Sequence, residues 1–343
     1  MWFDSLGAKS SSTLITTPYV NVLIDPGVAV MHPTFPASWE DKVRWAEEGF
    51  RRVLNASRRA DVVVITHYHY DHYTDFERGI YEGKEVIVKD PNQYINESQR
   101  GRALNFLESM VRELGGEGLE EFMTSPPHRA YGNPLSELVE ATSKDFGDYS
   151  RRREELLGKG LKWFRKLSSK WASWGWVKDF KLPLVSLAIG DGRSFKFGGL
   201  ELSLSTPRFH GVEFSRVGWV VSVGVRCCGF KVLYTSDLNG PIIEDYATSV
   251  LRFEPDLLIL DGPPTYLLGY TLNRINLGRA VDNGVRIVNG LGEGSFVVYD
   301  HHLAREPRFR ERTSRVWETS RVRVGTAAEF MGRKPVVVEV ARK

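Results

Sequence analysis

Residues 66–72 read Thr-His-Tyr-His-Tyr-Asp-His and directly follow the apolar run 62–65. This heptapeptide holds four side chains that can bind a metal ion: His67, His69, Asp71 and His72. Imidazole nitrogens and carboxylate oxygens suit a borderline divalent ion such as Zn²⁺. A single tetrahedral ion with an open position binds only three protein ligands, fewer than this one segment offers. The heptapeptide therefore predicts two neighbouring ions that share a water molecule.

The chemistry of such a pair is hydrolysis, because water held between two cations loses a proton near neutral pH and can attack an ester, a lactone or a phosphodiester. A chance cluster on a solvated loop and a structural zinc site are the alternatives. Structural zinc usually recruits thiolates in closed sets of four ligands, and the two cysteines lie far away in sequence, at 227 and 228. Three of the 8 histidines fall in the heptapeptide, which favours a metal-binding role over accident.

The 343-residue chain is long enough for one large domain or two ordinary ones. Its 42% hydrophobic and 26% charged residues are typical of a soluble globular protein, and a net charge of +3 does not indicate a general binder of polyanions. Two adjacent cysteines form no disulfide framework, and we interpret them as packing residues in a reducing compartment. With no signal peptide and no apolar run of about 20 residues, we predict a cytoplasmic protein without a membrane partner.

The first ninety residues alternate between strand and helix patterns, which predicts layered α/β structure. An amphipathic helix is expected over 39–54, where aromatic and aliphatic residues recur among charges. The expected strands are 13–17, 20–24, 61–65 and 85–88. The third of these strands delivers the heptapeptide at its carboxyl end.

Residues 91–182 lack a strong strand signal, and we interpret them as a helical insertion or lid within a single domain that spans 1–343. Apolar residues at steps of three and four predict helices over 96–114 and 151–177, with loops and short helices between them. Strand patterns then return at 201–205, 219–226, 231–234, 257–260, 286–288, 296–299 and 335–340. Gly229 marks the expected hairpin turn between the second and third of these strands.

Further candidate ligands lie just beyond apolar strands: His210, Asp237, His301 and His302. A lone histidine is more often a satisfied polar residue than a ligand. Their shared position strengthens the prediction, because ligands on rigid strand ends converge at little entropic cost. Asp261, which begins an Asp-Gly-Pro-Pro turn after another strand, belongs either to a rigid turn or to a rim loop near the metals.

The heptapeptide resembles the His-X-His-X-Asp-His signature of the metallo-β-lactamase superfamily. The order of the other candidates is similar to that family too, with Asp25 after the second strand and then His210, Asp237 and a late histidine. The resemblance covers most of the chain outside the insertion. It implies an α/β fold, a four-layer αββα sandwich with the metals at one rim and the helical insertion at one edge.

By that resemblance, each candidate has a place in a binuclear site. The first metal would be held by His67, His69 and His210, and the second by Asp71, His72 and His301 or His302, with Asp237 bridging both. Of the two late histidines we favour His301, because it follows Asp300 at a strand end as His67 follows Thr66. Two divalent ions are the expected cofactors, with Zn²⁺ first and Mn²⁺ or Fe²⁺ as alternatives.

Asp71 and Asp237 are the predicted catalytic residues, and Asp237 would help to position the attacking hydroxide. Asp25 would fix the orientation of a ligand imidazole, or would act only as a residue that ends a strand. Antibiotic-destroying members of the family carry Cys where this chain has Asp237, so β-lactam hydrolysis is not expected. Oxygen-reducing members carry Glu where this chain has His69, so that redox function is not expected either.

Residues 151–181 hold ten Lys or Arg against three acids, together with four tryptophans. Cations with interleaved aromatics could bind a phosphate backbone and stack bases, so nucleic acid is one predicted partner. The alternative, which we favour, is a solvated helix whose tryptophan face packs on the core or closes a lid. The reason is that Trp and Leu follow the same stripe.

The sequence as a whole predicts a binuclear metal-dependent hydrolase that uses a metal-bridging hydroxide on a small anionic ester. A phosphodiester ranks first among substrates, a lactone resembling those opened by sugar-phosphate lactonases second, and RNA or DNA third. The competing hypothesis is a metal-dependent module that binds nucleic acid through the insertion and performs no chemistry.

Overall fold

The computed structural model describes residues 1–342. Seven strands form the first sheet, in the order β1-β2-β3-β4-β5-β9-β8. These strands are β1 (Trp2–Phe3), β2 (Ser11–Ile15), β3 (Val22–Ile24), β4 (Val62–Ile65), β5 (Lys84–Val88), β8 (Phe180–Leu182) and β9 (Val185–Ile189). Neighbours from β3 to β9 run parallel, and every residue of β4 is buried. A strand buried on both faces has no polar alternation, which explains the continuous apolar run before the heptapeptide.

The second sheet also has seven strands, in the order β10-β11-β14-β15-β16-β17-β18. These strands are β10 (Ser194–Phe197), β11 (Leu200–Leu204), β14 (Val223–Cys227), β15 (Phe230–Tyr234), β16 (Leu257–Leu260), β17 (Phe296–Tyr299) and β18 (Arg323–Gly325). Between β14 and β15, Cys228 and Gly229 have φ of 56° and 75°. Positive φ at both central residues is what a two-residue hairpin turn requires, so the turn predicted at Gly229 is confirmed.

Two predicted helices, 39–54 and 96–114, are confirmed within a few residues. The helices are α1 (Trp39–Ser57), α2 (Arg78–Tyr81), α3 (Glu97–Glu113), α4 (Val139–Ser143), α5 (Ser150–Trp171), α6 (Glu244–Phe253), α7 (Arg274–Gly290), α8 (Phe309–Arg312), α9 (Ser314–Glu318), α10 (Ala327–Phe330) and α11 (Val336–Val340). Ser38 caps α1 by accepting a hydrogen bond from the backbone amide of Asp41. Asn96 caps α3 in the same way, through the amide of Gln99.

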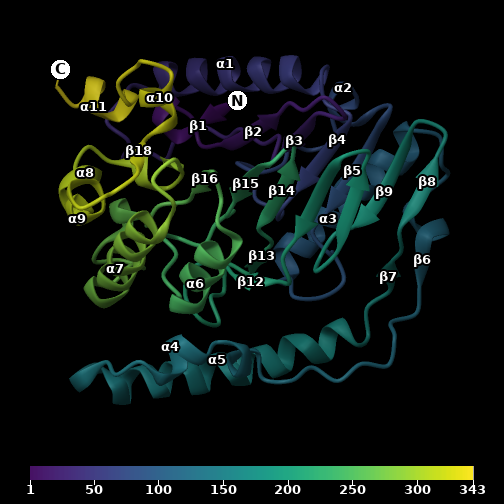
Figure 1. Ribbon diagram of the computed structural model, residues 1–343. Coiled ribbons are helices and arrows are strands. Elements are labelled where there is room, and N and C mark those ends of the chain that lie inside the picture. The colour runs from purple at the N-terminus through teal and green to yellow at the C-terminus, as the bar shows by residue number, and fades with distance from the viewer. Residues whose placement is uncertain (343) are drawn as a thin grey trace.

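The two sheets pack face to face, and the core between them holds apolar side chains of both, such as Val64 of the first sheet and Ile259 of the second. α1 and α3 pack on the outer face of the first sheet. α6 and α7 pack on the outer face of the second. Figure 1 shows α1 above the first sheet and α6 and α7 beside the second. The predicted four-layer αββα sandwich is confirmed.

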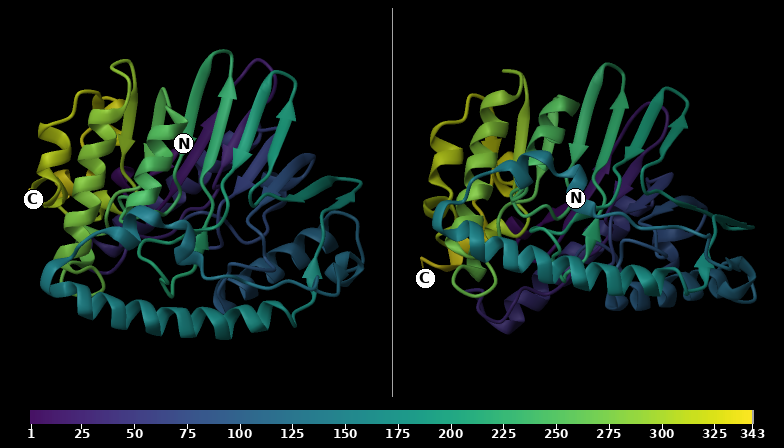
Figure 2. Two further views of the ribbon diagram at one scale, coloured as in Figure 1. Left: turned by 60° about the horizontal axis from the view of Figure 1, so that its bottom comes forward. Right: turned by 90° about the horizontal axis from the view of Figure 1, so that it is seen from below.

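The insertion crosses one side of the molecule, where α5 forms a long rod along the edge (Figures 1 and 2). Its apolar stripe packs inward: Trp171 is buried, and its indole N–H donates to the carbonyl oxygen of Ile95 at 2.9 Å. The helix ends at Trp171, before the predicted limit of 177, because β7 (Trp176–Val177) pairs with β6 (Met123–Thr124). The inward packing of this apolar stripe agrees with the interpretation that we favoured, a solvated helix whose tryptophan face packs on the core.

β8 adds a strand to the edge of the first sheet, so the insertion returns to the core before residue 182. The boundaries 91–182 and 1–343 stay predictions.

A separate pair of strands, β12 (Arg208–Phe209) and β13 (Trp219–Val220), flanks the loop 210–218. In residues 1–342, no helix has both the length and the apolar composition needed to cross a bilayer. The cytoplasmic location stays a prediction.

Two predicted strands are wrong. Residues 286–288 lie in the last turns of α7, where Ile287 and Val288 are buried. Residues 335–340 form the short helix α11 after Pro335, again with buried valines. A short apolar run of β-branched residues looks the same in a buried strand and in a buried helical segment, which is why the pattern misled in both places.

Candidate metal centre

Strand ends place the candidate ligands at one edge of the sandwich. The strands and the residues that follow them are β3 with Asp25, β4 with the heptapeptide, β12 with His210, β15 with Asp237 and β17 with His301 and His302. Polar groups gather there because the carboxyl ends of parallel strands meet at one edge. Five of the eight histidines lie in the two groups described below, and His302 lies beside them. The other two are His32 and His128.

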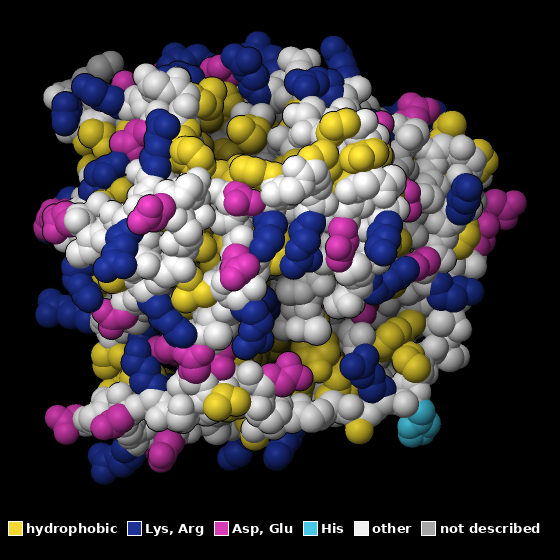
Figure 3. Space-filling model, in the orientation of Figure 1, with side chains coloured by type: hydrophobic (Ala, Val, Ile, Leu, Met, Phe, Trp, Pro, Cys, Tyr) yellow, Lys and Arg dark blue, Asp and Glu magenta, His cyan; other side chains and the backbone are white. Residues whose placement is uncertain are grey.

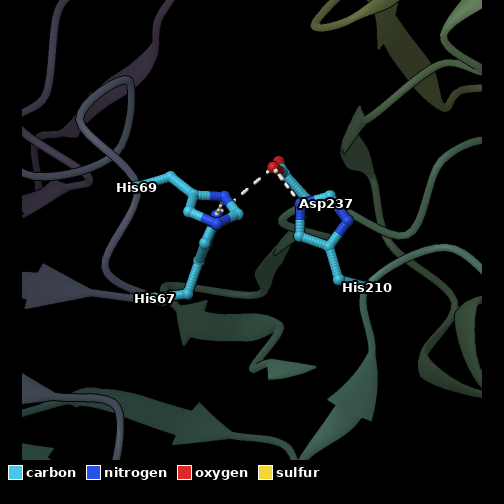
Figure 4. Close-up of side chains that lie close together, drawn as sticks. All are labelled: His67, His69, His210 and Asp237. Carbon is cyan, nitrogen blue, oxygen red and sulfur yellow. Dashed lines mark hydrogen bonds and ion pairs between the residues drawn. The ribbon is translucent and has the colours of Figure 1, made fainter. Parts of the chain in front are cut away.

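The first group contains His67, His69, His210 and Asp237, whose side chains point toward one another in Figure 4. His67 Nε2 lies 3.0 Å from His69 Nδ1 and 3.3 Å from Asp237 Oδ2. His210 Nε2 lies 3.0 Å from the same carboxylate oxygen. The three histidines assigned to the first metal are thus brought together around one oxygen of Asp237.

The second group contains Asp71, His72 and His301. The Nε2 atoms of His72 and His301 lie 3.0 Å apart, and Asp71 Oδ2 is 3.8 Å from His301 Nε2. The other oxygen of Asp237, Oδ1, lies 2.9 Å from His72 Nε2 and 3.4 Å from His301 Nε2. Asp237 therefore lies between the two groups and offers one oxygen to each, as a bridging residue would.

The two late histidines occupy different places. His301 faces His72 and belongs to the second group, whereas His302 Nε2 is 3.9 Å from Asp237 Oδ2. His302 Nδ1 lies 2.9 Å from Asp261 Oδ1. The geometry favours His301 as the late ligand, in line with the sequence. It also gives Asp261 a position beside the site, as a rim loop would.

The donor set fits a divalent cation. Asp237 is 1% exposed, and among the described residues no donor meets either carboxylate oxygen with hydrogen-bonding geometry. A buried carboxylate in that state costs free energy unless a cation compensates it. Burial lowers the pKa of His67 to about 4 and the pKa of His69 well below its ordinary value. Both imidazoles are therefore neutral at neutral pH, the state that binds metal.

The carboxyl groups are ionised in the same range. Burial alone would raise the pKa of Asp71, but Arg305 and then His72 hold it well below its ordinary value. Burial is likewise outweighed at Asp237, where His72 above all holds the pKa well below its ordinary value. For His72, burial is opposed by Asp237 and Asp25, which raise its pKa well above the ordinary value. The same two carboxylates would favour a divalent cation in place of that proton.

Asp25 orients His72 and is itself held from three sides. Its Oδ2 lies 2.7 Å from His72 Nδ1 and accepts hydrogen bonds from the hydroxyls of Thr66 and Tyr234, at 2.6 and 2.8 Å. Its Oδ1 accepts from the backbone amide of Thr66. Asp25 also ends β3 with a left-handed φ of 51°. Both interpretations offered by the sequence hold, because the turn presents the carboxylate to the imidazole.

The N-terminal segment supplies a second orienting carboxylate, Asp4, which the sequence did not reveal. Asp4 Oδ1 lies 3.1 Å from His301 Nδ1, and Asp4 Oδ2 accepts from the backbone amide of His302. Arg305 donates to Asp4 and, through Nη2, to Asp71 Oδ2 at 2.9 Å. Burial would raise the pKa of Asp4, but Arg305 and His301 hold it far below its ordinary value. Asp4 and Arg305 thus form a buried support beneath the second group.

The insertion reaches the centre through Gln99 on α3, another residue that sequence reasoning missed. Its Oε1 accepts from the amide of Tyr68 at 3.3 Å, and its Nε2 donates to the carbonyl of Val217 at 2.8 Å. The same Nε2 lies 3.3 Å from His69 Nε2. One buried amide therefore joins α3, the heptapeptide and the loop 210–218.

A hollow of about 300 Å³ opens onto both groups, and we call it the metal-centre cavity. Its lining includes four candidate ligands or their neighbours, His69, Asp71, His210 and His302, together with Arg305 and Tyr266. Backbone strain concentrates around it: Ser236, Asn239 and His302 have φ of 56°, 54° and 57°. Such left-handed residues cost about 1–3 kcal/mol each and persist where packing fixes them, most often at functional sites.

Known proteins resemble this chain in sequence. Residues 7–128 match the family model described as the metallo-beta-lactamase superfamily. A UPF0282 protein from Methanopyrus kandleri is 30% identical over 354 residues, which cover 99% of this chain and 95% of that protein. The chain belongs to the UPF0282 family of the metallo-β-lactamase superfamily. A second UPF0282 protein, from Korarchaeum cryptofilum, is 30% identical over 349 residues, which cover 99% of this chain and 91% of that one.

The resemblance predicted from the heptapeptide is confirmed. The UPF0282 alignments run through the insertion as well, since they include 99% of the chain. Among solved structures, the metallo-beta-lactamase fold protein YhfI from Bacillus subtilis aligns with 93% of this chain and 88% of its own, at 12% identity and a TM-score of 0.41. Superfamily membership indicates a metal-dependent hydrolase, and the clustered His and Asp residues supply a candidate site for the metal.

Proposed function

We propose that this UPF0282 protein is a binuclear metal-dependent hydrolase of a small anionic ester, with a phosphodiester as the first candidate. The observation that carries the proposal is the place of Asp237 between two groups of buried ligands. The first group, His67, His69 and His210, would hold one ion, and Asp71, His72 and His301 the other. When bound, two divalent ions would supply an acidified water as nucleophile and polarise the target oxygen.

Zn²⁺ remains the predicted ion, with Mn²⁺ or Fe²⁺ as alternatives for a set of imidazoles and carboxylates. The protein's own contribution is orientation and shielding. Asp25 and Asp4 fix the imidazoles of His72 and His301. Apolar side chains such as Leu267 and Ile242 line part of the metal-centre cavity. A ligand held there would feel electrostatic interactions more strongly than in water.

The preference for an anion rests on Arg305. Its Nη1 contacts only the hydroxyl of Tyr266, at 3.4 Å, while its other nitrogens bind Asp4 and Asp71. Both Arg305 and Tyr266 line the metal-centre cavity. A guanidinium edge and a phenol beside the ligands suit the non-bridging oxygens of a phosphate ester. A sugar-phosphate-like lactone is the alternative substrate, because its phosphate would use the same groups.

A nuclease or nucleic-acid-binding role stays the other alternative, and the packing of the tryptophans weighs against it. Trp163 stacks on Trp219 with ring centroids 5.5 Å apart, and Trp171 is buried. Trp171 therefore has no face free for a base, and one face of Trp163 is covered. The exposed cations of α5, such as Arg165 and Lys166, could still bind a phosphate backbone.

The test combines metal analysis with a panel of chromogenic phosphodiesters, lactones and thioesters. H69A removes a ligand of the first group, and H128A removes an exposed histidine that belongs to neither group. We expect about two metal ions per chain and turnover of an anionic ester in the wild type and in H128A. H69A should lose metal and activity together. Full turnover by H69A would exclude the proposed mechanism.

A further inference from the structure

A second hollow, of about 460 Å³, lies between the insertion and the body of the molecule. It shares no lining residue with the metal-centre cavity. Its walls are insertion residues 129–138, the strand β12 and one face of α6. Figure 3 shows a crevice between the strip of the insertion at the bottom of the view and the body above it. We call this hollow the Arg208 cavity, after the residue that lies in its wall.

Arg208 is a half-buried arginine without an acidic partner. Among the described residues its side chain makes neither a hydrogen bond nor an ion pair, and its guanidinium lies over the ring of Tyr246, 5.2 Å from the centroid. The buried Arg279 shows the usual arrangement, because Glu213 and Glu244 bind it at 2.8 and 2.7 Å. A guanidinium has five N–H donors, and those of Arg208 have no protein partner and keep access to solvent, so they are free to bind a ligand.

The residues that line the Arg208 cavity carry more positive than negative charge. Arg129 and Arg252 also line it. Of the two carboxylates in the lining, Asp245 already accepts hydrogen bonds from the backbone amides of Glu140 and Ala141. The other, Glu137, is exposed. Three arginines therefore line a hollow with one uncommitted carboxylate, which favours a ligand of negative charge.

We propose that the Arg208 cavity binds the phosphoryl group of a phosphorylated small molecule. Guanidinium groups bind phosphate through paired N–H donors, and a dianion matches three arginines better than a carboxylate does. Tyr94, Trp219 and Tyr246 line the cavity and offer apolar surface to the organic part of the ligand. The site does not depend on the hydrolase proposal, because it contains none of the candidate metal ligands.

Equilibrium dialysis of the purified full-length protein against labelled inorganic phosphate tests this site. Phosphate can also bind a metal centre, so the measurement is made in the wild type and in H69A. R208Q should weaken phosphate binding roughly tenfold or more in both backgrounds. A loss of this size is expected when charge-assisted hydrogen bonds to the phosphate are removed. R252Q, which changes an exposed residue of the rim, should weaken it several-fold. R78Q, which removes an exposed arginine on α2, is the matched control and should leave it unchanged.

Metal analysis of R208Q checks that the substitution leaves the nearby His210 undisturbed. The R208Q protein should contain as much metal as the wild type. Phosphate binding that survives in H69A and is lost in R208Q supports the Arg208 cavity. The proposal is overturned if the wild type fails to bind phosphate at millimolar concentration. It is also overturned if R208Q and R252Q bind phosphate as tightly as the wild type, or if only H69A loses binding.

Discussion

The histidines of the candidate centre differ in the partner that their Nδ1 atom meets. His72 is backed by Asp25, and His301 by Asp4. In the first group, His67 Nδ1 meets only hydroxyl groups, and His210 Nδ1 has no partner among the described residues. A carboxylate behind an imidazole fixes the ring and makes it a stronger ligand. The second group is therefore the better prepared of the two for a metal ion.

This difference predicts the effect of two substitutions. D25N and D4N keep the size of the side chain and remove its charge, so each should lower the affinity of the second group about 10- to 100-fold. Competition with a chromogenic chelator measures the two binding steps separately. D282N, in an exposed pair with Arg315, is the control and should leave both steps unchanged. Wild-type affinities in D25N and D4N would show that these carboxylates serve folding alone.

Single residues also show what the sequence could reveal about the site. His210, Asp237, His301 and His302 became candidates because each follows an apolar strand, and strand ends converge. Asp25 became one only through the family resemblance. Asp4 and Arg305 follow no such rule. They lie 301 positions apart and meet only after the N-terminal segment folds against the loop after β17. No local pattern distinguishes such residues from ordinary surface charges.

At the level of elements, most of the fold followed from periodicity. β16 and β17 have the predicted bounds, because each is a short apolar run that ends at an aspartate. The errors at 286–288 and 335–340 share one cause. Both are short runs rich in valine and isoleucine that are buried in helices rather than strands. Burial explains the apolar residues, whereas the choice between helix and strand depends on neighbours far away in the sequence.

The contact between α5 and the loop 210–218 can be tested with two glycines of one helix. A methyl group at Gly160 would lie 2.5 Å from Phe214 Cβ, whereas nothing lies within 4 Å of one at Gly158. G160A should therefore destabilise the protein by about 1–3 kcal/mol through overpacking. G158A should stabilise it by up to ~1 kcal/mol, the difference in helix propensity. Urea unfolding measures both, and equal effects would mean that α5 does not pack on this loop.

A buried ion pair ties the insertion to the core and should make stability depend on pH. Glu244 binds Arg279 of α7 and Lys144 of the insertion at 2.7 and 2.8 Å. Burial would raise the pKa of Glu244, but these two cations lower it from 4.5 to about 2. Its contribution is thus complete above pH 4.5 and is lost as the pH falls toward 2.

The matching variant is E244Q. At neutral pH it should lower the free energy of unfolding by about 3 kcal/mol, since it leaves a buried arginine partly uncompensated. The difference from the wild type should shrink below pH 4.5, where Glu244 binds a proton in the unfolded chain. Urea unfolding between about pH 3 and pH 7 tests this point. A difference that stays constant with pH would assign the effect to packing instead of charge.

For the molecule as a whole, the centre lies where the two sheets meet. The heptapeptide comes from the first sheet, whereas Asp237 and His301 come from the second. Each candidate ion would therefore join side chains of both sheets. The unfolded chain has no such arrangement of ligands, so any ion that binds the native centre stabilises the folded state.

Removal of metal should therefore lower the unfolding temperature. At a free ion concentration one hundred times Kd, one site contributes ~2.7 kcal/mol, and two sites contribute more. Calorimetry of the protein after treatment with a chelator should show a fall of several degrees, reversed by added Zn²⁺. H128A should show the same shift as the wild type, and H69A a smaller one. If the chelated and metal-loaded proteins unfold at the same temperature, the clustered ligands do not hold an ion across the two sheets.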